Sequence, residues 1–163
     1  MSNENILAYA VKQSEINYAE KNLVLMQAQL INKNANGEIL VTKIPKDADS
    51  YAAGKYWIPG IAMKFGEHPE EAGHRILTEE LEIEDREIQL IGSQSHYDKE
   101  KERWYLLFFF ETIKSMSEKE MNNTCEGIDE LLYLDLRKAN KDNSTQGLLD
   151  IREAMETPGK TYI

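Results

Sequence analysis

Residues 106–110 (Leu-Leu-Phe-Phe-Phe) limit the possible folds more than any other part of the chain. All five are apolar. Successive side chains of a β-strand point to opposite faces of a sheet, so a strand of this composition is buried on both faces. We therefore expect residues 104–113 to form a central strand of a sheet that is covered on both sides.

Hydrophobic patterns elsewhere predict the partners of this strand. Residues 23–31 alternate in part and lead through the turn Asn34-Ala-Asn-Gly37 into a strand at 38–44, which predicts a hairpin. Residues 46–54 and 115–127 are expected to be loops. The other predicted elements are strands at 55–58, 88–95 and 130–136, and helices at 5–18, at 69–81 and from Ser144 or Thr145 to about 157. This order predicts an α/β fold with a mixed β-sheet between helices.

The composition excludes several classes of site. The chain has 163 residues, the length of one domain, and its single cysteine, Cys125, excludes an internal disulfide and a cysteine-ligated zinc site. The net charge of −10 argues against a nucleic-acid polymer as partner, because such binders need a basic face. Neither a signal peptide nor an 18-residue apolar stretch is present, so we expect a cytoplasmic location and no membrane span. An acidic protein can still bind a phosphorylated small molecule through divalent cations.

Residues 57–83 read as a strand, a glycine-containing loop and a helix with two adjacent acids, Glu79 and Glu80. In a regular α-helix of about 100° per residue, Glu79 lies roughly 60° to one side of Ile76 and Glu80 roughly 40° to the other. The two carboxylates are therefore expected on one side of the helix, about 90° from Leu77 and Leu81. Hard divalent cations bind carboxylates of this kind, although a solvated acidic face has the same pattern.

This segment resembles the signature box of the Nudix hydrolases, G-x5-E-x7-R-E-U-x-E-E-x-G-U, in which U is a bulky aliphatic residue. The matching positions are Glu67, Arg75, Leu77, Glu79, Glu80 and Ile83. In layout, the resemblance extends over roughly residues 22–157. It implies an α/β/α sandwich of the Nudix type, with residues 1–163 as a single domain and residues 1–21 as an N-terminal extension.

Three positions depart from the box. Ile61 and Glu82 replace glycines, and Ile76 replaces the Glu that follows Arg75. That Glu is a metal ligand in the family, so Ile76 is either the mark of a weakened metal site or a residue of the core. A Glu at position 82 ends a helix with positive φ only at a cost of about 1 kcal/mol, which favours one further helical turn. Acids that could complete a metal shell lie outside the box: Glu111, Glu118, Glu120, Glu126 and Asp129.

The resemblance also implies roles for individual residues. Glu79 and Glu80 would hold Mg²⁺ or Mn²⁺, and Glu80 or an acid of the 115–127 loop would orient or deprotonate the attacking water. Gly60, Glu67 and Arg75 are expected to be structural, the last two as an ion pair that joins the loop to the helix. Candidate substrate contacts are Trp57, His96 and Tyr97. Trp57, Phe65 and Trp104 could stack a base, although aromatic residues beside a sheet usually belong to the core.

Two functions follow from this resemblance. The first is a metal-dependent hydrolase, weakened by Ile76, that cleaves a pyrophosphate bond in a nucleoside diphosphate linked to another group. The second is a catalytically degenerate member that binds a nucleotide or a protein partner without hydrolysis. Because Glu67, Arg75, Glu79 and Glu80 occur together, the enzyme is favoured, with a nucleotide-type small molecule as substrate; a homodimer is left open.

Overall fold

A computed structural model describes residues 24–48, 52–98, 102–122 and 128–156. The helix predicted at 5–18 and Cys125 lie outside these residues. The strands are β1 (Val24–Ile31), β2 (Ile39–Lys43), β3 (Tyr56–Trp57), β4 (Gly60–Ala62), β5 (Ile88–Asp98), β6 (Arg103–Thr112) and β7 (Glu130–Leu134). The helices are α2 (Pro69–Arg75), the π-helix η1 (Ile76–Glu80), α3 (Glu118–Met121), the 3₁₀-helix η2 (Leu136–Lys138) and α4 (Gln146–Glu156). In this part of the chain, no helix has the length and apolarity that a membrane crossing requires.

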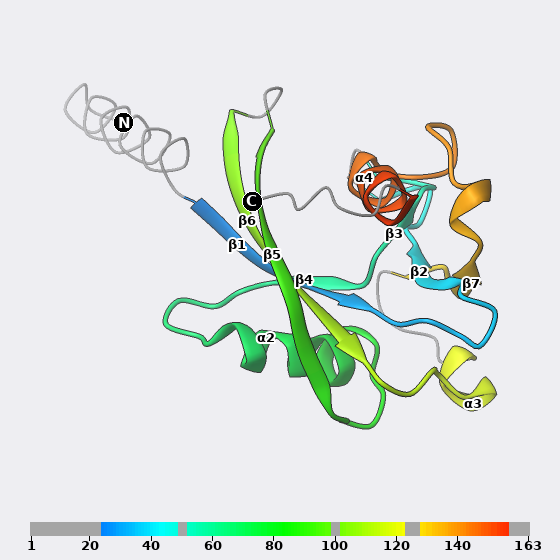
Figure 1. The fold of residues 1–163 in the computed structure, drawn as a ribbon, viewed down its shortest axis with the longest axis horizontal. Helices are drawn as coiled ribbons and strands as arrows, with labels where there is room; N and C mark the ends of the chain where they lie inside the picture. Colours follow the sequence, from blue (N-terminus) through cyan, green and yellow to red (C-terminus); the bar gives the residue numbers. More distant parts are fainter. Residues whose placement is uncertain (1–23, 49–51, 99–101, 123–127, 157–163) are drawn as a thin grey trace, which may run out of the picture.

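The strands form two sheets. The four-stranded sheet has the order β4-β1-β6-β5, in which β1 and β6 are parallel and the other neighbours antiparallel. The three-stranded sheet is antiparallel and has the order β3-β2-β7. Figure 1 shows α2 and α4 on opposite sides of the strands. The predicted α/β fold with a mixed sheet between helices is confirmed.

The hairpin predicted over residues 23–44 is wrong beyond its turn. Gly37 has the expected positive φ, 77°, and the Leu40 N–H donates to the Asn32 carbonyl at 2.9 Å. Past this point, β1 enters the four-stranded sheet and β2 the three-stranded sheet. A turn signal is local and fixes only the pairing beside it. β1 pairs with β4 and β6, and β2 pairs with β3 and β7, so each strand has its partners outside the predicted hairpin.

β6 occupies the central position predicted from residues 106–110, between β1 and β5. Phe108 and Phe110 pack in the core on the α2 side, and Phe109 packs in the core on the α4 side. The prediction that the strand is buried on both faces is wrong at its start, where the Trp104 side chain is 48% exposed. Trp104 belongs to neither core cluster, so this end of β6 extends beyond both cores.

Two cores lie on the two faces of the sheets, and alternate residues of the strands divide between them. The first core packs strand residues against α2 and η1, and the second packs strand residues against α4. Residues of the first core include Ala28, Leu30, Leu40, Leu131, Ala72, Ile76 and Leu77. Residues of the second core include Ile31, Ile39, Val41, Leu134, Leu148 and Leu149.

The helix predicted at 69–81 begins as expected but changes type. Pro69 is its first residue, and the His68 N–H donates to the Glu71 carboxylate at 2.9 Å as part of a capping box. From Ile76 the helix is a π-helix, in which the Leu81 N–H reaches the Ile76 carbonyl, five residues back, at 2.9 Å. The regular α-helical geometry assumed for residues 76–80 is therefore wrong.

The helical segment ends before Glu82 and does not run a further turn, which corrects the expectation from the missing glycine. Glu82 has a φ of 50°, and the Ile83 N–H donates to the Leu77 carbonyl at 2.9 Å. We expect Glu82→Gly to raise the free energy of unfolding by about 0.5–1 kcal/mol, because glycine takes positive φ without strain. Chemical denaturation measures this change. The control, Glu84→Gly, lies at an exposed position without positive φ and should lower stability; a loss in both variants would contradict the prediction.

Candidate functional site

The loop between β4 and α2 is fixed to the helix by one ion pair. An Arg75 guanidinium nitrogen, Nη1, lies 3.0 Å from each carboxylate oxygen of Glu67, and the Lys64 N–H donates to Glu67 Oε2 at 2.6 Å. Both side chains are largely buried, with 7% of Glu67 and 15% of Arg75 exposed. Burial opposes ionisation, yet the hydrogen bonds from Lys64 and Arg75 keep the pKa of Glu67 below its ordinary value. The structure thus places the two expected partners in contact.

Glu79 lies on the surface between two cations. Its carboxylate oxygens are 3.0 Å from Arg75 Nε and 3.3 Å from Lys64 Nζ, and its side chain is 49% exposed. The hydrogen bond from Arg75 is the main cause that lowers the pKa of Glu79. Glu79 is therefore ionised and paired within the protein. A metal ion would have to compete with Arg75 and Lys64 for this carboxylate.

Glu80 has a different environment from its neighbour. One of its carboxylate oxygens, Oε2, is covered and has no hydrogen-bond partner within the described part of the chain. Burial raises the pKa of Glu80 to about 8, and a hydrogen bond from the Gly60 backbone opposes this rise only in part. Near neutral pH the carboxyl group of Glu80 is therefore protonated in most of the molecules. The two acids thus do not form the pair of like carboxylates that the helical wheel predicts.

Gly60 brings β4 close to β1 at this point. It pairs with Gln29, and a Cβ atom at position 60 would lie 2.8 Å from the Ala28 carbonyl oxygen. Such a contact is shorter than side chains tolerate, so the close approach requires glycine here. The same backbone position supplies the hydrogen bond to Glu80.

Ile76 lies in the first core, with its side chain fully buried. The sequence left open whether Ile76 marks a weakened metal site or belongs to the core, and the structure supports a core residue. The position that carries an acid in the box is apolar here and closed to solvent. A carboxylate at this position would need a different orientation to contact a cation.

The residues predicted to contact the substrate do not all lie near Glu79 and Glu80. Tyr97 stacks on Trp104 with 5.1 Å between ring centroids, and both rings are substantially exposed. Trp104 of β6 pairs with Val24 of β1, and Tyr97 of β5 pairs with Trp104. Val24 lies about 16 Å along β1 from Gln29, which pairs with Gly60. The side chain of His96 lies outside the described residues. Trp57 is partly buried on β3. The expectation that Trp104 and Phe65 belong to the core is wrong, because both side chains are exposed.

The acids proposed to complete a metal shell have other contacts or lie elsewhere. Glu111 pairs with Lys33 at 2.9 Å, Glu120 pairs with Arg86, and Glu118 is an exposed first residue of α3. Asp129 is exposed, and Glu126 falls outside the described residues. Within those residues, no three His, Cys, Asp or Glu side chains are grouped so that they could hold a metal ion.

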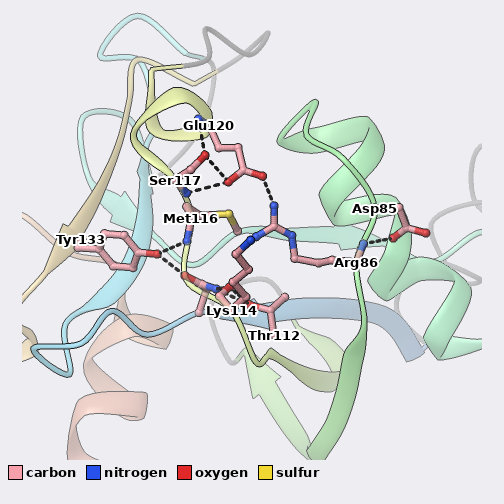
Figure 2. A network of polar contacts seen from close by, with 9 residues as sticks. Asp85, Arg86, Thr112, Lys114, Met116, Ser117, Glu120 and Tyr133 are labelled. Atoms are coloured by element: carbon pink, nitrogen blue, oxygen red, sulfur yellow. Dashed lines mark hydrogen bonds and ion pairs between the residues drawn. The ribbon is translucent and has the colours of Figure 1, made fainter.

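A polar network fixes the segment that follows β6 (Figure 2). Arg86, between η1 and β5, pairs with Glu120 of α3, whose carboxylate also accepts the Ser117 N–H at 2.7 Å. The Tyr133 hydroxyl accepts the Met116 N–H at 2.7 Å and donates to buried Asn32. No motif marks these residues, and their contacts join segments up to 101 positions apart, so sequence reasoning missed them.

The family model described as the NUDIX domain matches residues 27–154. The chain is similar to the MutT protein from Methanosarcina mazei Go1 (17% identity, TM-score 0.67, 85% of this chain and 96% of that one). It is also similar to the MutT NUDIX hydrolase from Burkholderia pseudomallei, with 19% identity and a TM-score of 0.63 over 81% of this chain and 98% of that one. The NUDIX domain of Shewanella oneidensis NrtR, complexed with ADP ribose, is similar with 15% identity and a TM-score of 0.57 over 96% of this chain and 98% of that one. The curated proteins gave no match.

Proposed function

The chain belongs to the NUDIX domain family, and we propose that it hydrolyses the pyrophosphate bond of a nucleoside diphosphate linked to another group. The proposal includes a divalent cation, Mg²⁺ or Mn²⁺, with Glu79 and Glu80 as its ligands. The observation that carries it is the covered Glu80 oxygen without a hydrogen-bond partner. A buried polar atom of this kind is costly unless a proton, a cation or a ligand satisfies it.

The two carboxylates of Glu79 and Glu80 are the kind of donor that a hard divalent cation binds. Carboxylate oxygens are the ligands that Mg²⁺ and Mn²⁺ prefer, and Mg²⁺ often binds through one or two carboxylates with waters in its other positions. Such a cation would polarise the diphosphate and lower the pKa of a bound water. Ligation requires Glu80 to lose its proton and the cation to compete with Arg75 and Lys64 for Glu79. These requirements support the weakened activity expected from Ile76.

The residues of this chain supply the other parts of the reaction. The oxygen of a water attacks one phosphorus, the bond from that phosphorus to the bridging oxygen breaks, and a carboxylate accepts the proton of the water. We assign this carboxylate to Glu80 or to an acid of residues 115–127. Arg75 and Glu67 hold the loop that carries Lys64. The proposed substrate is a small molecule, the proposed location is the cytoplasm, and a homodimer is compatible with the proposal.

The test is turnover of a panel of nucleoside diphosphate derivatives with Mg²⁺ or Mn²⁺. We expect Glu80→Gln to lower turnover at least about 100-fold, because it removes a metal ligand and one of the two candidate proton acceptors. Glu84→Gln is the matched control, since Glu84 is an exposed acid outside the box pair, and it should leave turnover unchanged. Equal turnover in wild type and Glu80→Gln would contradict the role of Glu80.

A catalytically degenerate, ligand-binding protein is the second candidate. It is favoured by the apolar core position of Ile76 and by the pairing of Glu79 with Arg75 and Lys64. This candidate predicts no turnover with any member of the panel and undiminished nucleotide binding in the presence of a chelator. The hydrolase predicts that chelation abolishes turnover.

A further inference from the structure

Phe65 has its whole side chain in solvent. At 108%, its exposure is the highest among the large apolar side chains of the described residues. Single exposed apolar residues are common and need no explanation by themselves. The surroundings of Phe65, however, combine a rigid backbone with the charges of the candidate site.

The backbone on both sides of Phe65 is fixed. The Glu67 N–H donates to the Lys64 carbonyl at 3.1 Å, and the Lys64 N–H donates to the Glu67 carboxylate, which is itself held by Arg75. Gly66 has a φ of 78°, which lets this turn close. The aromatic ring therefore extends from a held turn, and its binding would order few further backbone torsions.

The same turn lies beside the candidate metal ligands. The ammonium group of Lys64, the residue before Phe65, is 3.3 Å from the Glu79 carboxylate. A ligand with its diphosphate at Glu79 and Glu80 would thus have the Lys64 cation at hand, and the uncovered ring of Phe65 belongs to the next residue of the same turn. A nucleotide carries the matching groups, because its phosphates attract cations and its base has a π-face that stacks on aromatic rings.

We propose that Phe65 stacks on the nucleobase of the substrate and so favours nucleoside diphosphates over diphosphates without a base. The inference rests on the proposed function, since it takes the diphosphate to lie at Glu79 and Glu80. Tyr97 and Trp104 are less suited to this role because their rings stack on each other. Trp57 is partly buried.

The experiment compares binding of ADP and inorganic pyrophosphate, both with Mg²⁺, by titration calorimetry. We expect Phe65→Ala to weaken ADP binding about tenfold and to leave pyrophosphate binding unchanged, since only ADP has a base. Phe65→Trp should retain the wild-type affinity for ADP. Because the Phe65 side chain is fully exposed, Phe65→Ala should unfold at the same denaturant concentration as wild type.

Leu90→Ala is the matched control. Leu90 is an exposed apolar residue of β5, at the opposite edge of the four-stranded sheet from β4, so this variant should bind ADP as wild type does. Equal ADP affinities of wild type and Phe65→Ala would overturn the inference, as would equal losses for ADP and pyrophosphate. Wild-type binding of pyrophosphate but not ADP would also overturn it. Failure of the wild type to bind either probe would overturn the proposed function as well.

Discussion

Raising the pH from about 5 to about 8.5 is expected to destabilise the wild-type protein by a few kcal/mol more than its Glu80→Gln variant. The pKa of Glu80 is about 8 in the folded protein, against 4.5 for an ordinary glutamate. Between these values the folded state retains a proton that the unfolded state releases. Stability therefore falls as the pH rises through this range, at about 1.4 kcal/mol for each unit of pKa difference.

The difference between the two proteins isolates Glu80 from the other acids. Glu67, Glu79 and Asp135 have lowered pKa values, so their contributions change below pH 4.5, outside this range. Glutamine has the shape of the protonated acid and does not titrate. Urea denaturation of both proteins at several pH values provides the measurement. Parallel stability curves for wild type and Glu80→Gln would show that Glu80 is an ordinary exposed acid.

Ile76→Glu is expected to lower the free energy of unfolding by about 3–5 kcal/mol. Ile76 is fully buried in the first core with Leu77, Leu81 and Phe110, so the new carboxylate would lose its water without gaining a cation. The substitution restores the acid of the signature box in sequence only. We expect it to weaken the fold before it can improve metal binding. Denaturant unfolding measures the first effect, and metal titration of the folded variant measures the second.

Two controls separate charge from position. Thr78→Glu places the same charge on an exposed position of the same π-helix and should change stability by no more than about 0.5 kcal/mol. Ile76→Val keeps the position apolar and should cost about 0.5–1.5 kcal/mol. A stable Ile76→Glu variant with tighter metal binding would instead show that this side chain can leave the core, and that a lost ligand is the defect of the site.

The parts of the site that depend on local signals could be predicted from the sequence. Pro69 and the acids after it mark the start of α2, and the resemblance to the signature box implied the ion pair found between Glu67 and Arg75. The central position of β6 follows from its five consecutive apolar residues. In each case the residues that carry the signal also form the structure.

Features that depend on distant contacts could not be predicted. β4 has three residues, too few for an alternating pattern, yet it provides the backbone hydrogen bond to Glu80. The π-helix has no signal in the sequence, and it changes the directions of the two acids from those of a regular helix. The unequal environments of Glu79 and Glu80 result from packing against Gly60 on one side and Lys64 on the other.

The division of alternate strand residues between two cores has a consequence for how the protein unfolds. Each core contains side chains from both sheets: Leu30 and Leu40 meet in the first, and Ile31 and Val41 in the second. Loss of either sheet would expose apolar surface in both cores at once. The two sheets are thus energetically coupled, so they should open in one cooperative transition and protect their amide hydrogens from exchange to similar extents.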